Sequence, residues 1–396
     1  MGDVFLYDAV RTPRGKARAD GGLADLSPQE LVGRQAAALA QRCGAAATEP
    51  DALLIGCVTQ SGAQGAHIGL VAKLHAGLPD YTAAHTINNY CASGLTAIGQ
   101  AAAMIVSGQA RSVLAGGVES MSRAPFMSDK AAYYSDTSLP PRARYVPPVL
   151  AADRLAHAEG ISRAELDAVA LASQRRAAAS DADPVLQASR IATGSLSGEE
   201  CPRPGTTAER LAAMPPAFGA LQDDFTAALD GEHFPALHTL AHAPPICDGA
   251  GLALVGGADL DAAPRARIVA YAECGGDPAA SLTAGMAAMD KVLNRAGLGL
   301  GDMDRIEFME AFAVTIAKFL RDCRPDPARV NFAGGHLAKG HPMGASGAIL
   351  ASSLLDCLDA CEGRLGLVVV TGATGVGAAM IVERIARRST AYINPR

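Results

Sequence analysis

The chain has no tryptophan, and phenylalanine and tyrosine bring its aromatic content to only 4%. Charged residues are also scarce at 19%, the net charge is −6, and the sequence contains no basic block. Because a nucleic-acid-binding surface needs clustered lysine and arginine, this balance argues against a nucleic-acid partner. The 396 residues are 49% hydrophobic, which is typical of a large globular protein and not of a disordered one.

The nine cysteines are odd in number and include no Cys-x-x-Cys pair and no zinc-type spacing. We therefore expect reduced thiols in the cytoplasm and no metal site. No apolar run approaches the roughly 20 residues of a membrane helix, so no membrane partner is expected. The first residues, Met1–Leu6, have neither a basic region nor a cleavage site and are predicted not to be a signal peptide.

Strand-like and helix-like runs alternate toward both ends of the chain, a pattern that predicts an α/β fold. A proline-rich middle stretch, with one helix over 163–179, indicates an inserted covering segment. Predicted strands are 4–10, 53–58, 85–90, 112–116, 252–255, 268–271, 306–309, 330–333, 366–371 and 378–384, and the other predicted helices are 29–42, 92–107, 282–295 and 345–358.

Cys91 follows an extended apolar stretch and precedes a predicted helix, within the run Asn88–Leu95. A thiol at a helix N-terminus feels the positive end of the helix dipole, which predicts a lowered pKa and a reactive thiolate. The small neighbours Ala92, Ser93 and Gly94 would let a thioester approach the sulfur. Cys91 is therefore a candidate acyl-accepting nucleophile, and a buried inert cysteine is the alternative.

A glycine-dense segment, Gly334–Gly347, contains His341 directly before Pro342. A histidine in such a turn can act as the base for a thiol, although a turn histidine bonded to the backbone is the other interpretation. His336 lies five residues earlier, and no cysteine or carboxylate joins the two at metal-binding spacing.

The segment Thr371–Gly377 is also rich in glycine but precedes a predicted strand. A dinucleotide-binding loop must open a helix, so an NAD site is rejected. A tight turn there would present backbone N–H groups, which predicts an oxyanion hole for a thioester carbonyl. The two halves also echo each other, since Cys91–Gly94 and Gly344–Gly347 each open a helix that leads into a strand, and we expect both turns to meet at one seam.

Together these motifs resemble the thiolase family in order and spacing over nearly the whole chain. The matching pieces are Arg11–Gly15, the Cys91 loop, Gly116–Ser122, Glu310–Ala313, Gly340–Pro342 and the final glycine turn. The resemblance implies a duplicated five-layer α/β/α/β/α fold with a loop (lid) domain inserted in the first half. The implied division is 1–122 with 246–265 for the N-terminal half, 123–245 for the lid and 266–396 for the C-terminal half.

The resemblance further implies an acyltransferase that acts on acyl-CoA thioesters, with no permanently bound cofactor, as a homodimer or homotetramer. Cys91 would accept the acyl group with the help of His341, and the backbone amides of Cys91 and Ala373 would form the oxyanion hole. Glu310 and His336 would stand behind these groups, with Glu310 ordering the loop or orienting His341. For Glu310, and for Glu119 near the Gly116–Gly117 strand end, a structural role is favoured over a chemical one.

The chain departs from the family at two positions that serve carbon–carbon chemistry. Most thiolases have a second cysteine where this chain has Thr371, and an asparagine where it has Met309. A threonine hydroxyl cannot act as a base without an activating partner, and methionine is only a weak hydrogen-bond acceptor. The loop that lines the pantetheine channel in the family contains Pro244 and Pro245 here, and with Phe312 these are the candidate cofactor contacts.

Three hypotheses follow from this mixture. The chain still makes or cleaves 3-oxoacyl-CoA, with a water or His336 replacing the lost base. Alternatively, it transfers the acyl group to a non-enolate acceptor such as an amine, an alcohol or a carrier-protein thiol. The third possibility is a non-catalytic partner subunit, against which the retained Cys91 and His341 loops argue.

Overall fold

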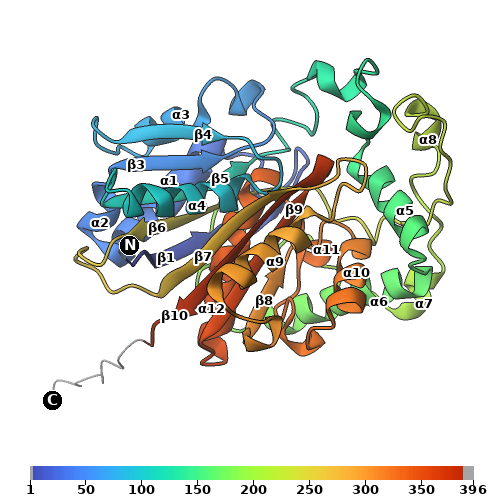
Figure 1. Cartoon of the computed structure of the whole chain (residues 1–396). Coiled ribbons are helices and arrows are strands. Elements are labelled where there is room, and N and C mark those ends of the chain that lie inside the picture. The colour runs from blue at the N-terminus through green and yellow to red at the C-terminus, as the bar shows by residue number, and fades with distance from the viewer. Residues whose placement is uncertain (1–2, 387–396) are drawn as a thin grey trace.

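The computed structural model describes residues 3–386, which form a mixed sheet with helices on its faces (Figure 1). The strands follow the order β4-β3-β5-β6-β1-β7-β10-β9-β8, and a short strand β2 pairs with β6 beside this path. Their bounds are β1 Phe5–Arg11, β2 Gly15–Lys16, β3 Ala52–Gly56, β4 Ala83–Ile87, β5 Ser112–Glu119, β6 Cys247–Gly256, β7 Ala266–Gly275, β8 Arg305–Phe308, β9 Leu365–Gly372 and β10 Val376–Arg384.

The helices pack on and between the two halves of the sheet, which gives the predicted α/β/α/β/α layers. Helices α1 (Pro28–Cys43), α2 (Ala45–Thr48) and α3 (Ile68–His75) accompany the N-terminal strands, and α9 (Ala284–Ala296) covers β7, β9 and β10. Helices α4 (Ser93–Val106) and α12 (Ser346–Ala360) pack against each other and contact strands of both halves. The largest apolar cluster surrounds this central pair, so the core lies between the two halves of the sheet.

Between β5 and β6 the chain leaves the sheet and forms the segment at the right of Figure 1. This segment contains α5 (Pro148–Glu159), α6 (Arg163–Ser180), α7 (Ala208–Ala212) and α8 (Leu221–Asp224), and it packs on α10 (Ala313–Cys323) and α11 (His336–Lys339). We refer to residues 123–245 as the lid, and the boundaries of the lid and of the two halves stay predictions. Their outer ends, residues 1–2 and 387–396, lie outside the described residues.

Local sequence signals explain where the helices begin. The side chains of Ser27 and Glu30 cap α1 reciprocally, and Ser162 and Glu165 do the same for α6. Such a capping box satisfies N–H groups that have no partner within the helix. The helices predicted at 29–42 and 163–179 are confirmed for this reason.

The strand predicted at 330–333 is wrong. Val330 forms only an isolated bridge with Ile306, and Asn331 has a left-handed backbone with φ of 46°. The side chain of Asn331 instead bonds the backbone of Phe308, so an asparagine–backbone contact replaces strand pairing there. Helices α3, α5 and α10 were not predicted, although α10 is strongly amphipathic.

Glycines allow the two repeated turns to meet at the predicted seam. A Cβ atom on Gly94 would lie 2.7 Å from the carbonyl oxygen of Gly344, and a Cβ atom on Gly347 would clash with the backbone nitrogen of Leu95. Larger residues would separate these backbones. The prediction that the Cys91 and His341 loops converge is therefore confirmed.

Candidate active site

Cys91 lies in the turn that joins β4 to α4, two residues before the helix begins. The Ser93 hydroxyl accepts a hydrogen bond from the backbone N–H of Asn89 at 2.8 Å, which fixes the turn. Tyr90 has a left-handed backbone with φ of 45°, and so do Met343 at 25° and Thr374 at 55° in the facing loops. Non-glycine residues in this conformation are strained and cluster at functional sites, so the three loops mark this region.

The thiol of Cys91 faces the imidazole of His341. The distance from Cys91 Sγ to His341 Nε2 is 3.2 Å, and the other ring nitrogen, Nδ1, lies 2.7 Å from the hydroxyl oxygen of Ser346. The backbone N–H of His341 also donates to the carbonyl oxygen of Pro245 at 2.8 Å. The histidine is thus held on three sides, with one nitrogen directed at the sulfur.

The prediction of a lowered thiol pKa is wrong for the unliganded protein. Burial and then the nearby Glu119 carboxylate raise the pKa of Cys91 to about 12, although the backbone amides of Ala373 and Cys91 oppose this by hydrogen bonding to the sulfur. Burial and then the charge of Arg14 lower the pKa of His341 to about 3. Loss of solvent outweighs the helix dipole, so the resting pair is a neutral thiol and a neutral imidazole.

The Ala373 amide belongs to the final glycine turn, which connects β9 and β10. Its hydrogen bond to the Cys91 sulfur places this turn beside the thiol, as the resemblance implied. Thr374 follows with its N–H donating to Ser281 Oγ at 3.0 Å, which holds the turn in place. The turn precedes strand β10, so the rejection of a dinucleotide loop agrees with its structure.

Glu119, at the end of β5, joins the loops around the site. Its carboxylate accepts hydrogen bonds from the N–H groups of Val58, Thr59 and Gly344, each at 3.0 Å, and from the Gln64 side chain at 2.7 Å. Burial raises the pKa of Glu119, and these hydrogen bonds oppose that shift. Glu119 therefore braces the loops around the site.

A cavity of about 620 Å³ opens onto the thiol. Residues of the lid and of both halves line this cavity, and they include the candidate cofactor contacts Pro244, Pro245 and Phe312. The other lining residues are Val58, Tyr90, Cys91, Phe126, Met127, Tyr134, Tyr145, Pro147, Pro148, Val149, Arg203, Phe218, Leu221, Phe225, Leu240, Ala243, Ile246, Leu282, Met309, Ala311, His341, Met343, Thr371 and Ala373.

Thr371 and Met309 both line this cavity, so the two departures from the family pattern lie at the site itself. Both side chains are fully buried. The Thr371 hydroxyl accepts a weak hydrogen bond from the N–H of Gly285 at 3.5 Å. That contact makes the hydroxyl an acceptor and gives it no base that would take its proton.

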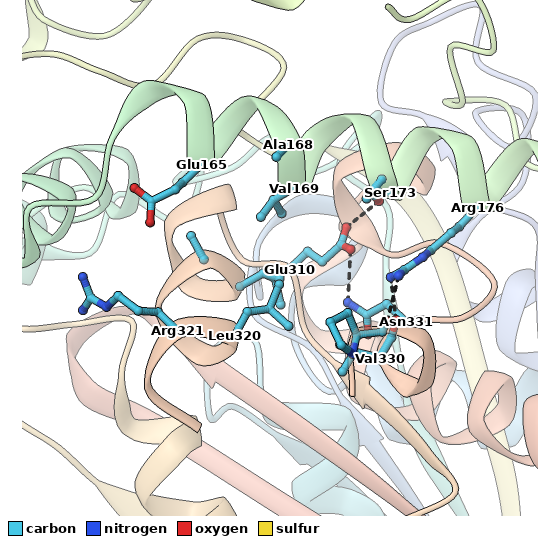
Figure 2. A pocket seen from close by; sticks show the side chains of 14 residues that line it. Glu165, Ala168, Val169, Ser173, Arg176, Glu310, Leu320, Arg321, Val330 and Asn331 are labelled. Atoms are coloured by element: carbon cyan, nitrogen blue, oxygen red, sulfur yellow. Dashed lines mark hydrogen bonds between the residues drawn. The ribbon is translucent and has the colours of Figure 1, made fainter. Parts of the chain in front are cut away.

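Glu310 lines a second cavity between α6 and α10 (Figure 2) and is not among the residues that line the cavity at Cys91. Its carboxylate accepts hydrogen bonds from the Ser173 hydroxyl at 2.7 Å, from the Asn331 amide at 3.1 Å and from the N–H of Leu337 at 2.9 Å. These bonds tie the lid helix α6 to the segment that leads to His341. Of the two roles considered for Glu310, the contacts therefore match ordering of the loop, while His341 is oriented by Ser346.

His336 lies behind His341, with ring centroids 5.2 Å apart and the rings nearly perpendicular. It is fully buried, neither ring nitrogen has a hydrogen-bond partner among the described residues, and it is not among the residues that line the cavity. Burial, and then the charge of Arg14, hold the pKa of His336 well below its usual value. Its position does not support a role as the missing base.

Sequence reasoning missed Ser346 and the aromatic residues that the lid contributes to the cavity. Ser346 is the first residue of α12, five positions after His341, and a serine in this glycine-rich run was the available signal. The lid residues Phe126, Tyr145 and Phe225 had no comparable signal, because only the packing of the lid brings them to Cys91.

Models of known protein families match both the first and the second part of the chain. Residues 4–230 match the family model described as "Thiolase, N-terminal domain", and residues 262–384 match "Thiolase, C-terminal domain". A beta-ketoadipyl-CoA thiolase from Pseudomonas putida is 34% identical over 97% of this chain and 100% of its own length. A 3-oxoadipyl-CoA/3-oxo-5,6-dehydrosuberyl-CoA thiolase from Escherichia coli K12 is also 34% identical, with the same coverage.

Solved structures agree with these sequence matches. Human mitochondrial 3-ketoacyl-CoA thiolase superposes with a TM-score of 0.84 at 29% identity, over 97% of this chain and 99% of that one. Its complex with CoA gives a TM-score of 0.85 over 97% and 98%. The chain belongs to the thiolase family and is an enzyme of that family. Within residues 3–386, no helix has the length and apolar character to cross a membrane, and no cluster of three potential metal ligands occurs.

Proposed function

We propose that Cys91 accepts an acyl group from an acyl-CoA thioester, with His341 as its base. The main support for this proposal is the 3.2 Å contact between Cys91 Sγ and His341 Nε2, inside a cavity that Ala373 also lines. His341 takes the thiol proton as the sulfur bonds to the thioester carbonyl carbon, and the amides of Cys91 and Ala373 stabilise the oxyanion. The carbon–sulfur bond to CoA then breaks, and His341 returns the proton to the departing thiolate.

In its thiolase form the reaction cleaves 3-oxoacyl-CoA with CoA, or condenses the acyl group with acetyl-CoA. The names of the curated relatives and the CoA complex of a similar structure support CoA thioesters as substrates. Pro244, Pro245 and Phe312, which line the cavity, would contact the pantetheine arm. Coenzyme A enters as a substrate and not as a resident cofactor.

A second candidate reaction is transfer of the acyl group to an amine, an alcohol or a carrier-protein thiol. It is favoured by Thr371, whose hydroxyl only accepts a hydrogen bond, at 3.5 Å from the N–H of Gly285. Among the described lining residues, His341 is the histidine next to the sulfur. The tyrosines Tyr90, Tyr134 and Tyr145 offer no second base, because burial raises the pKa values of their phenols and keeps them protonated. An acceptor that needs no removal of an α-proton does not require the second base that Thr371 fails to supply.

Intact-mass spectrometry after incubation with acetyl-CoA and hexanoyl-CoA tests the acyl-enzyme. We expect one acyl adduct, absent in Cys91→Ala and retained in the matched variant Cys274→Ala, whose cysteine does not line the cavity. An adduct that persists in Cys91→Ala would refute the proposal, and absence of any adduct would support the non-catalytic subunit. Chasing the adduct with acetyl-CoA, CoA or N-acetylcysteamine then separates carbon–carbon chemistry from simple acyl transfer.

We further propose that the protein is a homodimer or homotetramer and resides in the cytoplasm. Strand β4 ends the sheet, and the adjoining side chains Leu74 and Tyr81 are 64% and 65% exposed, which supports association at this edge. Free thiols such as Cys57, Cys247 and Cys357 are in keeping with a reducing compartment. Light scattering should give two or four times the chain mass, and Leu74→Glu should lower it while Val185→Glu on the lid should not. A monomeric parent protein would contradict the assembly.

A further inference from the structure

The cavity at Cys91 gathers aromatic side chains that are rare elsewhere in the chain. The sequence has nine phenylalanines, eight tyrosines and no tryptophan, and seven of these aromatic residues line this one cavity. Five come from the lid or its flanks, and two come from the halves beneath it. The seven are Tyr90, Phe126, Tyr134, Tyr145, Phe218, Phe225 and Phe312.

Two tyrosine hydroxyls and the imidazole of this wall have partners within the protein. The Tyr134 hydroxyl donates to Asp129 Oδ2 at 3.0 Å, and the Tyr145 hydroxyl contacts the sulfur of Met127 at 3.8 Å. Both ring nitrogens of His341 are used, one by Ser346 and one by Cys91. These groups present carbon surface to an occupant of the cavity.

Few charged side chains line the cavity. Arg203 is the cation among the described lining residues, and it lies exposed at the rim. The carboxylate of Asp129, behind Tyr134, adds negative charge to the aromatic side. A carboxylate that lies away from Arg203 would be buried without a partner, so an acyl group that ends in one is disfavoured among the aromatic residues of this wall.

We propose that the acyl group carried by Cys91 is apolar to its far end, and that the lid aromatic residues form its binding site. This inference rests on the proposed role of Cys91 as the acyl acceptor, because an acyl group on Cys91 would then lie in the part of this cavity that the lid lines. It separates the chain from the relatives named for 3-oxoadipyl-CoA and beta-ketoadipyl-CoA, whose acyl groups end in a carboxylate. The substrate class is then that of monocarboxylic acyl-CoA thioesters with an extended apolar chain.

A matched pair of ligands tests this inference apart from the chemistry. Hexanoyl-CoA and adipoyl-CoA have the same number of acyl carbons and differ in a terminal methyl or carboxylate group. Calorimetric titration of Cys91→Ala, which cannot be acylated at that position, should give a dissociation constant at least about tenfold lower for hexanoyl-CoA. Equal affinities, or tighter binding of adipoyl-CoA that is lost in Arg203→Gln, would overturn the inference.

Truncation of the wall gives a second, independent measurement. Phe126→Ala should reduce the preference for hexanoyl-CoA about tenfold, because it removes one apolar face of the cavity. The side chain is 36% exposed, so the variant should remain folded, and Phe332→Ala, which removes a 40% exposed phenylalanine outside the cavity, is the matched control. An unchanged preference in Phe126→Ala would contradict the inference. Because binding is measured on Cys91→Ala, a preference for hexanoyl-CoA without any acylation of the parent protein would refute only the proposed function.

Discussion

Ser346 Oγ lies 2.7 Å from Nδ1 of His341, on the side of the ring opposite Cys91. When Nδ1–H donates to this hydroxyl, Nε2 carries the lone pair and is free to take the proton of the thiol at 3.2 Å. A neutral hydroxyl fixes the ring without adding charge. The histidine therefore stays neutral in the resting protein, as its burial also favours.

Replacement of Ser346 by alanine should slow acylation of Cys91 by about tenfold, because the ring loses its orientation but keeps its base. This loss is smaller than the ~10²–10⁴-fold that a general base contributes, which His341→Ala should remove. Rapid-quench mass spectrometry measures the single-turnover rate. Ser346→Thr should restore the rate, and Ser352→Ala on the same helix is the matched control. An unchanged rate in Ser346→Ala would show that packing alone positions His341.

The reactivity of Cys91 should increase steadily with pH. Since its thiol pKa is raised to about 12, the thiolate fraction grows about tenfold per pH unit throughout the neutral range. Alkylation by iodoacetamide, followed at Cys91 by peptide mass spectrometry, should therefore rise without a plateau between about pH 6 and pH 9. A plateau that begins near pH 5 would instead reveal a resting thiolate–imidazolium pair, contrary to the lowered pKa of His341.

Restoring the two missing groups should raise carbon–carbon bond formation. Thr371→Cys supplies a thiol on the cavity wall, and Met309→Asn supplies a hydrogen-bonding amide for the enolate oxygen. We expect the double variant to form acetoacetyl-CoA from acetyl-CoA at least about tenfold faster than the parent, with smaller gains in each single variant. Absorbance of the magnesium enolate of the product provides the assay. No gain in the double variant would indicate that the altered cofactor loops at Pro244 and Pro245, and not Thr371 and Met309, limit carbon–carbon bond formation.

Glu119→Gln should destabilise the protein although it preserves the shape of the side chain. The carboxylate accepts hydrogen bonds from four N–H groups, and a carboxamide NH₂ would face one of these donors. A buried donor left unpaired costs about 1–3 kcal/mol, so the free energy of unfolding should fall by that amount. Urea denaturation measures the change, and the exposed Glu49→Gln is the control. Equal stabilities of Glu119→Gln and the parent would show that the loops do not depend on this carboxylate.

Local patterns predicted the parts of the fold that local physics controls. The helices that begin at Pro28 and Arg163 follow from their capping boxes, and those that begin at Ser93 and Ser346 follow from their apolar pattern; all four are confirmed within a residue or two. The strand predicted at 330–333 failed because Asn331 bonds the backbone of Phe308, a contact across more than twenty residues. Such a contact leaves no trace in the surrounding sequence.

The sequence by itself determined the family, the two facing motifs and the changes at Thr371 and Met309, because these depend on residue type and order along the chain. Only the tertiary structure decided the electrostatic state of Cys91, since burial outweighs the helix dipole that the sequence displays. It also decided that Glu310 braces the lid and that the lid aromatic residues surround the thiol. Burial and long-range packing arise when distant segments meet, and neither is a property of any one segment.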